Sequence, residues 1–227
     1  MQPVEKRVTA FGDLSVHSIF STIQGEGPNA GRPAIFIRLA GCNLQCPLCD
    51  TDYTTGRQMM PVIAIAEEVV KLGTPGIKLI VITGGEPFRQ DLDSLIATLL
   101  SMGYKVQIET NGTLPWPNAE KDIVEIVCSP KTPTIAKQLV PYITAYKYVI
   151  SAGNMAKDGI PIEALGLSLE RYLFRPPEGF PIEKVYIQPE DSKHSHQNEQ
   201  NLGQAICSCM KNGYTLCIQV HKTINLP

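Results

Sequence analysis

Three cysteines lie close together in the first quarter of the chain, at a spacing that suits a metal centre. Cys42, Cys46 and Cys49 fall within eight residues, directly after a short apolar run at 34–39. Three thiolates would leave one iron of a cubane cluster without a protein ligand, whereas electron-carrier clusters normally take four cysteines and structural zinc takes four Cys or His ligands. Because an open iron can bind a substrate, this loop is a candidate catalytic centre. The residues leave two alternatives open, a zinc site with a remote fourth ligand and cysteines without metal.

Polar residues also follow several other apolar runs. Gly84, Gly85 and Glu86 come after the run at 79–83, where glycines would let the backbone approach a ligand and Glu86 would supply an acceptor. Arg38 lies inside an apolar run and must reach a partner or solvent, so it either binds an anion or forms a structural ion pair. Further candidates at the ends of apolar runs are Glu109, Ser129, Lys131, Gln188 and His221.

Short β-rich runs alternate with helix-like segments from residue 16 onward. The expected strands are 16–22, 34–39, 79–83, 105–109, 123–128, 146–150, 184–187 and 216–220, the last of which leads into His221. The expected helices are 62–72, 92–102 and about 198–211, followed by the C-cap candidates Gly73, Gly103 and Gly213. This alternation predicts a mainly parallel α/β sheet, either open and doubly wound or a full or partial barrel. In each case active-site groups gather at the carboxyl ends of the strands.

Composition narrows the class of function. The chain has 227 residues, 43% apolar and 19% charged, with a net charge of -2 and no Lys/Arg run, so nucleic acid and acidic membrane surfaces are poor partners. We expect one domain over 1–227, with 1–15 as an extended N-terminal segment. No apolar stretch is long enough to span a membrane and no signal peptide is evident, which predicts a cytoplasmic protein. Seven cysteines favour metal chemistry over a disulfide framework, and we expect Cys128, Cys207, Cys209 and Cys217 to be buried small side chains.

The Cys-x3-Cys-x2-Cys spacing resembles the signature of the radical S-adenosylmethionine (SAM) superfamily, and Thr83-Gly84-Gly85-Glu86-Pro87 resembles its Gly-Gly-Glu-Pro motif. The resemblance implies a partial (β/α)6-type barrel and a [4Fe–4S] cluster on the three cysteines. It also implies that SAM chelates the open iron and is split, on reduction, into methionine and a 5′-deoxyadenosyl radical. One departure is Leu48, where the superfamily commonly has an aromatic residue. The residues that the resemblance places at SAM are Asp50, Gly85, Glu86, Ser129, Lys131 and Gln188.

The block Gln24-Gly25-Glu26-Gly27-Pro28, together with 31–42 and Asp50-Thr51, is similar to the 7-carboxy-7-deazaguanine synthase family. This resemblance implies a lyase that converts 6-carboxy-5,6,7,8-tetrahydropterin to 7-carboxy-7-deazaguanine by ring contraction and loss of ammonia, in queuosine and 7-deazapurine biosynthesis. It implies Mg²⁺ on Thr51, a homodimer, and a reductase such as flavodoxin as electron donor. The implied substrate-binding residues are Gln24, Gly25, Glu26, Arg38, Thr83, Glu109, His221 and Pro227.

Two other functions fit parts of the sequence. A glycyl-radical activating protein shares the cysteine spacing but acts on a polypeptide, which does not require the set of polar residues that includes Gln24, Glu26 and His221. A non-enzymatic iron–sulfur or zinc binding module would leave Gly84, Gly85 and Glu86 unexplained.

Overall fold

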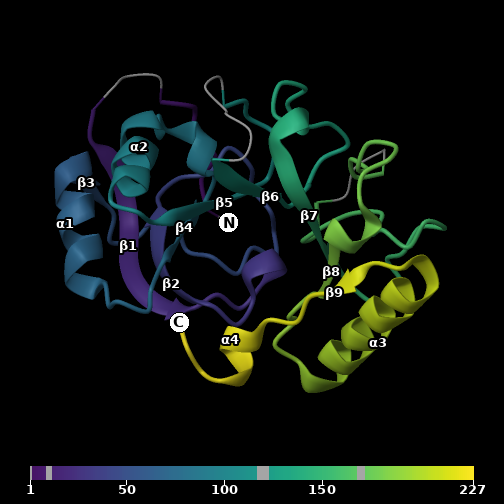
Figure 1. Ribbon diagram of the computed structural model, residues 1–227. Helices are drawn as coiled ribbons and strands as arrows, with labels where there is room; N and C mark the ends of the chain where they lie inside the picture. The colour runs from purple at the N-terminus through teal and green to yellow at the C-terminus, as the bar shows by residue number, and fades with distance from the viewer. Residues whose placement is uncertain (1, 9–11, 117–122, 168–171) are drawn as a thin grey trace.

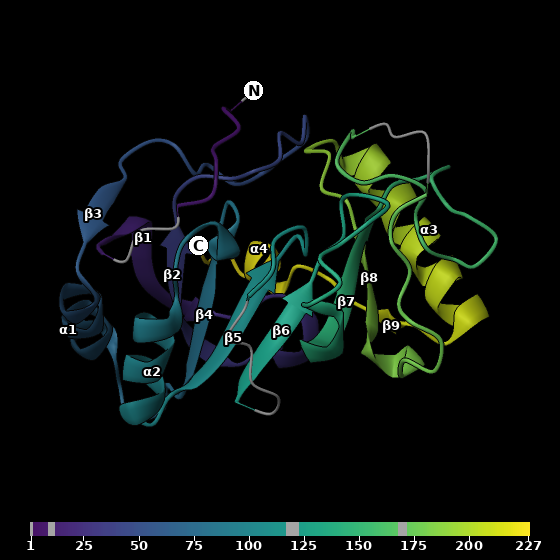
Figure 2. The same cartoon turned by 90° about the horizontal axis from the view of Figure 1, so that it is seen from above.

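One continuous nine-stranded sheet organises the computed structural model, which describes residues 2–8, 12–116, 123–167 and 172–227. The strand order is β3-β1-β2-β4-β5-β6-β7-β8-β9. At one end, β1 (Leu14–Ile23) pairs antiparallel with both β2 (Pro33–Leu39) and β3 (Gln58–Met60). The sheet bends around one side of the molecule (Figure 2). Among the described residues its end strands β3 and β9 do not pair with each other, so the barrel is partial.

Seven strands, from β2 onward in the sheet order, run parallel. These strands therefore bring their carboxyl ends to the same edge of the sheet. This result confirms the predicted mainly parallel α/β architecture. After β2 they are β4 (Leu79–Gly84), β5 (Lys105–Thr110), β6 (Val124–Cys128), β7 (Ile143–Ile150), β8 (Val185–Pro189) and β9 (Thr215–Leu216).

The longer helices cover the outside of the sheet (Figures 1 and 2). They are α1 (Val62–Leu72), α2 (Asp93–Ser101) and α3 (Ser195–Asn212), close to their expected ranges. The described residues that connect β5, β6, β7 and β8 contain no α-helix, so the helical layer is less complete than a regular (β/α)6 alternation would give. The remaining elements are α4 (Val220–Thr223) and four 3₁₀ turns at Gly27–Asn29, Pro87–Arg89, Val140–Tyr142 and Ile182–Lys184.

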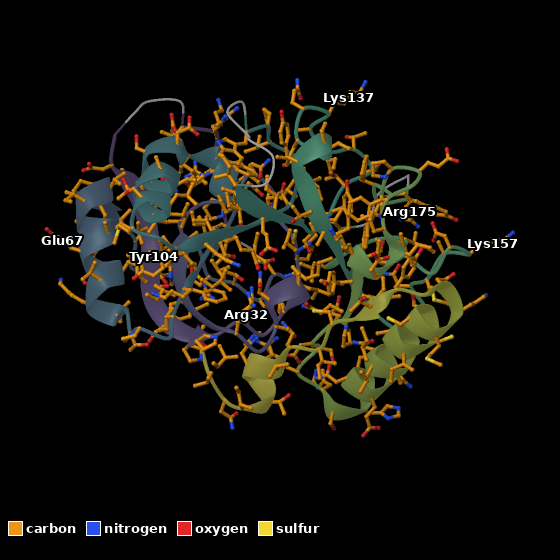
Figure 3. The ribbon with its side chains drawn as sticks, viewed as in Figure 1. Arg32, Glu67, Tyr104, Lys137, Lys157 and Arg175 are labelled. Carbon is orange, nitrogen blue, oxygen red and sulfur yellow. The ribbon has the colours of Figure 1, made fainter. Side chains whose placement is uncertain are left out.

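The two faces of the sheet carry different side chains because successive residues of a strand point to opposite faces. In β2, Ile35, Ile37 and Leu39 belong to the main core together with the helices, whereas Phe36 and Arg38 face a cavity on the other side. The inner face is therefore where polar residues of the strands can meet a ligand. On the outer surface charged residues point outward, as Figure 3 shows for Glu67 and Lys137.

Two sequence-based expectations are wrong in the C-terminal quarter. The strand expected at 216–220 ends at Leu216, and Val220 and His221 belong to α4. After Leu216 the chain leaves the sheet, and the Val220 backbone N–H, shared between the oxygens of Gly25 (3.1 Å) and Ile218 (3.0 Å), holds the segment at the end of β1. Cys207 is exposed on α3 rather than buried, while Cys128, Cys209 and Cys217 are buried as expected. The short strand β3 was not predicted.

No helix of the described residues is long and apolar enough to cross a membrane.

Candidate active site

A cavity of about 450 Å³ lies against the inner face of the sheet and reaches the carboxyl ends of its parallel strands. This volume is typical of small-molecule sites, which range over about 300–1,000 Å³. The cavity brings together nearly every residue that the sequence singled out: Gln24, Gly25, Glu26, Arg38, Cys42, Cys46, Cys49, Asp50, Thr51, Thr83, Gly85, Glu109, Ser129, Lys131, Gln188, His221 and Pro227. Glu86 is the exception and lies behind the cavity wall.

The cysteine loop forms one wall of this cavity. Cys42 is buried, whereas Cys46 and Cys49 are half-buried. Burial raises the pKa of Cys42 to about 12, against a hydrogen bond from the Leu44 N–H that lowers it, and burial likewise raises the pKa of the other two thiols. All three are thus protonated at neutral pH, and metal binding would displace their protons.

The donor set of the loop, three thiols, fits an iron–sulfur cluster. Three thiols line the same cavity. In the described part of the chain, no group of three or more Cys, His, Asp or Glu side chains stands ready to hold one metal ion. A polynuclear centre needs no such single point, because each thiolate binds a different metal atom.

The glycine motif after β4 packs directly on the cysteine loop. A Cβ added to Gly85 would lie 2.5 Å from the Gly41 carbonyl carbon and 2.9 Å from the Cys42 Cβ, so only glycine allows this approach. Glu86 donates its backbone N–H to the Gly41 oxygen (3.0 Å). The two segments are therefore held in a fixed relation at the edge of the cavity.

Glu86 is fully buried and its carboxylate is engaged by the protein. It accepts hydrogen bonds from the Thr110 hydroxyl (2.7 Å) and from the backbone N–H groups of Asn111 (2.7 Å) and Phe88 (3.1 Å). Burial raises its pKa to about 7, although these hydrogen bonds oppose the shift. In this structure Glu86 positions the loop after β5, and its contact with SAM stays a prediction.

A residue outside the sequence-based set, Lys147 of β7, joins two of the expected substrate ligands. Its ammonium group pairs with Glu26 and with Glu109 (2.7 Å), and it is itself almost fully buried. Burial alone would lower the pKa of Lys147, but the two carboxylates outweigh burial and raise it above its ordinary value. For Glu26, burial raises the pKa, but Lys147 outweighs that effect and brings the pKa down to about 2. Lys147 and Glu26 are therefore both charged at neutral pH.

The C-terminal segment 217–227 lies at the end of the cavity that contains Glu26. Figure 1 shows this segment, in yellow, running from β9 through α4 toward β1. His221 lies against Gly25, since a Cβ on that glycine would be 2.7 Å from the imidazole Cγ and still closer to Nδ1. The Thr22 hydroxyl donates to the Pro227 oxygen (3.0 Å), and the Gln219 amide donates to Glu26 (2.7 Å). The segment is thus fixed to the motif that follows β1.

Arg38 and Thr83 are neighbours on adjacent strands of the inner face. The guanidinium of Arg38 lies 5.2 Å from the ring centre of Phe20, and its Nε has no hydrogen-bond partner among the described residues. Burial lowers the pKa of Arg38, and the nearby Asp50 opposes this shift. A half-buried guanidinium with a buried, unpaired Nε, facing a cavity, suits an anionic or carbonyl group of a ligand.

Ser129, Lys131 and Gln188 line the cavity from the ends of β6 and β8. The Lys131 ammonium donates to the Ser129 carbonyl (2.9 Å) and is buried. Burial lowers the pKa of Lys131, and the Cys46 thiol, if ionised, raises it. A cation close to the cysteine loop can offset the negative charge that thiolates bring.

Residues 2–8, the described first part of the N-terminal segment, pack against the cysteine loop on the side away from the cavity. Glu5 donates its N–H to the Cys42 oxygen (2.7 Å), and the Gln2 side chain donates to the Thr51 carbonyl (2.7 Å) and accepts from the Tyr53 N–H (2.8 Å). Arg89, which is buried, pairs with Glu5 (3.0 Å). The structure therefore places this segment beside Thr51, whose role as a Mg²⁺ ligand stays a prediction.

Residues 36–133 match the family described as the radical SAM superfamily. This match runs from Phe36 in β2 through the cysteine loop and the glycine motif to the loop after β6, and these segments meet at the cavity. The fold and the site together define a radical SAM enzyme, and that class implies a [4Fe–4S] cluster and SAM. The predicted superfamily is confirmed.

Curated relatives match nearly the whole chain. The chain is 41% identical over 225 residues to the 7-carboxy-7-deazaguanine synthase of Rhodospirillum rubrum, covering 94% of this chain and 92% of the relative. It is 38% identical over 234 residues to the enzyme of the same name from Rickettsia prowazekii, with coverages of 97% and 93%. The chain belongs to the 7-carboxy-7-deazaguanine synthase family. The crystal structure of QueE from Escherichia coli shares its fold, with a TM-score of 0.69, 24% identity, and coverage of 91% of this chain and 94% of that one.

Proposed function

We propose that this chain converts 6-carboxy-5,6,7,8-tetrahydropterin to 7-carboxy-7-deazaguanine, with contraction of the ring and loss of ammonia. The name of its curated relatives supports this activity. The single observation that carries the proposal is that a polar set suited to a flat heterocycle shares one cavity with the three-cysteine loop. A peptide substrate, as for a glycyl-radical activating protein, would need an open groove rather than this set.

The substrate half of the cavity supplies directional groups. Glu26 and Glu109 accept hydrogen bonds from ring and exocyclic N–H groups, and Gln24 both donates and accepts. Arg38 binds the substrate carboxylate or carbonyl, because this half-buried guanidinium lines the cavity and its Nε has no partner among the described residues. His221 closes the site from α4. Phe36 and other apolar side chains of the wall keep water away from a reactive intermediate.

The other half of the cavity holds the cofactors. Cys42, Cys46 and Cys49 hold the cluster, and Asp50, Gly85, Glu86, Ser129, Lys131 and Gln188 bind or position SAM. When bound, the cluster and SAM supply a carbon-centred radical that removes a hydrogen atom from the substrate. The chain itself orients the substrate and excludes solvent. Thr51, exposed to the cavity, binds Mg²⁺, which keeps several waters and so needs few protein ligands.

The proposal includes partners and a compartment. Electrons come from a small reductase such as flavodoxin, which is supported by the half-exposed position of Cys46 and Cys49. We expect a homodimer, testable by the mass of the protein in solution. The three free thiols suit a reducing compartment such as the cytoplasm.

An anaerobic turnover assay tests the activity. The reconstituted protein is given SAM, dithionite, Mg²⁺ and 6-carboxytetrahydropterin, and the product is followed by mass. We expect 7-carboxy-7-deazaguanine with little net consumption of SAM. Release of 5′-deoxyadenosine without that product would overturn the pterin assignment, and an absence of SAM cleavage would overturn the mechanism.

Two variants separate the two halves of the cavity. Glu26→Ala and His221→Ala should keep the cluster and bind SAM but lose turnover. Both variants change the substrate wall, which is the set of cavity side chains Gln24, Glu26, Arg38, Glu109 and His221. Full activity in both variants would refute its substrate-binding role.

A further inference from the structure

Lys147 stands between the two acidic residues of the substrate wall and has no role in the assignments above. We propose that Lys147 is a positioning residue for the substrate, which holds Glu26 and Glu109 in place as a matched pair of hydrogen-bond acceptors. The inference rests on the proposed function, because it concerns how the same wall recognises the N–H groups of a heterocycle.

The geometry joins three distant parts of the sequence at one ammonium group. Glu26 follows β1, Glu109 lies in β5 and Lys147 lies in β7. Lys147 pairs with both carboxylates, and its side chain is only 7% exposed while theirs are 17% and 13% exposed. An ammonium group so enclosed has little water to compete for its donors, so its position is set by the two acids.

Each carboxylate uses its two oxygens in the same way. One oxygen, Oε2, accepts from Lys147. The other, Oε1, accepts from amides: Gln219 (2.7 Å) and Gln188 (3.2 Å) on Glu26, and Gln107 (2.7 Å) and Gln24 (3.3 Å) on Glu109. A carboxylate has about four lone-pair directions, so each Oε2 keeps one for a further donor. A substrate N–H can therefore share the oxygen that Lys147 orients.

The ammonium group also decides the charge of the wall. Two carboxylates that face one buried space repel each other, and burial disfavours their charged forms, so without Lys147 at least one would take up a proton. A protonated carboxyl carries a donor where the substrate needs an acceptor. Other titratable groups near this set are His221, Lys131 and Cys217, and Lys147 acts on the pKa of each, so the pH dependence of binding must be read together with a direct titration of the two carboxylates.

The test compares Lys147→Met with the wild-type protein and with Lys71→Met, the same change at an exposed helix ion pair with Glu68. Each protein is reconstituted, and binding of 6-carboxytetrahydropterin is measured with SAM present and no reductant, between about pH 5 and pH 8. For Lys147→Met we expect the Kd to rise at least tenfold at the acidic end and to recover as the pH rises, because the carboxylates ionise late. Wild type and Lys71→Met should show no such recovery.

A second readout does not depend on the substrate. Infrared titration, with Glu26→Gln and Glu109→Gln spectra to assign the bands, follows ionisation of the two carboxylates directly. We expect ionisation in Lys147→Met at a higher pH than in wild type. If Lys147→Met does not fold, Lys147→Arg, which keeps the charge, should titrate as wild type does.

The two readouts distinguish the possible failures. Wild-type protein that does not bind the pterin would overturn the proposed function and the substrate role of Lys147, while the infrared comparison would still decide how Lys147 acts on the acids. Unchanged carboxylate titration in folded Lys147→Met would overturn the positioning role even where the pterin binds. The positioning role would also be overturned if the carboxylates of Lys147→Arg ionised at a higher pH than those of the wild-type protein.

Discussion

Gly25 is the point at which a single methyl group should disable the substrate wall. A Cβ at this position would lie 2.7 Å from the His221 Cγ, closer still to Nδ1, and 2.9 Å from the His221 backbone nitrogen. Contacts of this kind normally need about 3.5 Å. Because both the ring and the backbone of His221 are too close, rotation of the side chain alone cannot relieve the overlap. Gly25→Ala must push α4 away from the end of β1.

The size of the effect follows from the cost of overpacking. Inserting a methyl group into a packed site costs about 1–3 kcal/mol, which corresponds to about 5- to 150-fold in an equilibrium constant. The half-buried α4 is the element that yields, so we expect the cost to appear as weaker binding rather than as unfolding. The KM for 6-carboxytetrahydropterin should rise by about tenfold or more, while iron content and SAM affinity stay as in wild type.

Gly203→Ala is the matched control for this prediction. Gly203 lies in α3, and a Cβ there would meet no heavy atom within 4 Å. This variant should keep the wild-type KM and gain about 1 kcal/mol in helix stability. A Gly25→Ala protein with an unchanged KM would refute the placement of His221. Loss of the cluster in this variant would contradict the expectation that the change affects only the substrate wall.

Three further results are expected. Cys46→Ser should abolish the cubane cluster, so iron content and visible absorption after reconstitution should be near background, and a full complement of iron would contradict the assignment. Arg89→Met leaves Glu5 without its inner partner and should lower the free energy of unfolding in urea by about 2 kcal/mol; no change would mean that the N-terminal segment does not brace the loop. The pKa of Glu26 is about 2, below its unfolded value of about 4.3, so its contribution to stability is present above pH 4.3 and lost as the pH falls toward 2. Glu26→Gln should flatten that part of the stability profile, and an unchanged profile would contradict it.

The sequence predicted those parts of the site that depend on local patterns. The cysteine spacing and the glycine motif are contiguous, and their positions after β2 and β4 followed from short apolar runs with turn residues at their ends. Parallel strands bring their carboxyl ends to one edge, so residues as far apart as Cys42 and Gln188 could be expected to share a cavity. The partial barrel itself was expected from the resemblance, since periodicity does not determine how far a sheet closes.

The parts that the sequence missed depend on contacts between distant segments. Lys147 lies inside the apolar run of β7, the same signal that drew attention to Arg38, and could have been found by the same rule. The turn at Val220 was not predictable from its neighbours, because an apolar run at 216–220 fits a strand, and the contact of Val220 with Gly25 joins segments far apart in the sequence. Leu216 is thus the last residue of the sheet, and His221 reaches the site from a helix.

The contacts of the C-terminal segment also bear on how the molecule folds. Gln219 meets Glu26 and Pro227 meets Thr22 across separations of 193 and 205 residues, whereas most neighbouring strands of the sheet are joined by much shorter connections. Closing so long a loop costs more chain entropy than closing a short one, so local strand pairs form first. We therefore expect the contacts of this segment to form late, so that the ability to recognise a ligand depends on the last steps of folding.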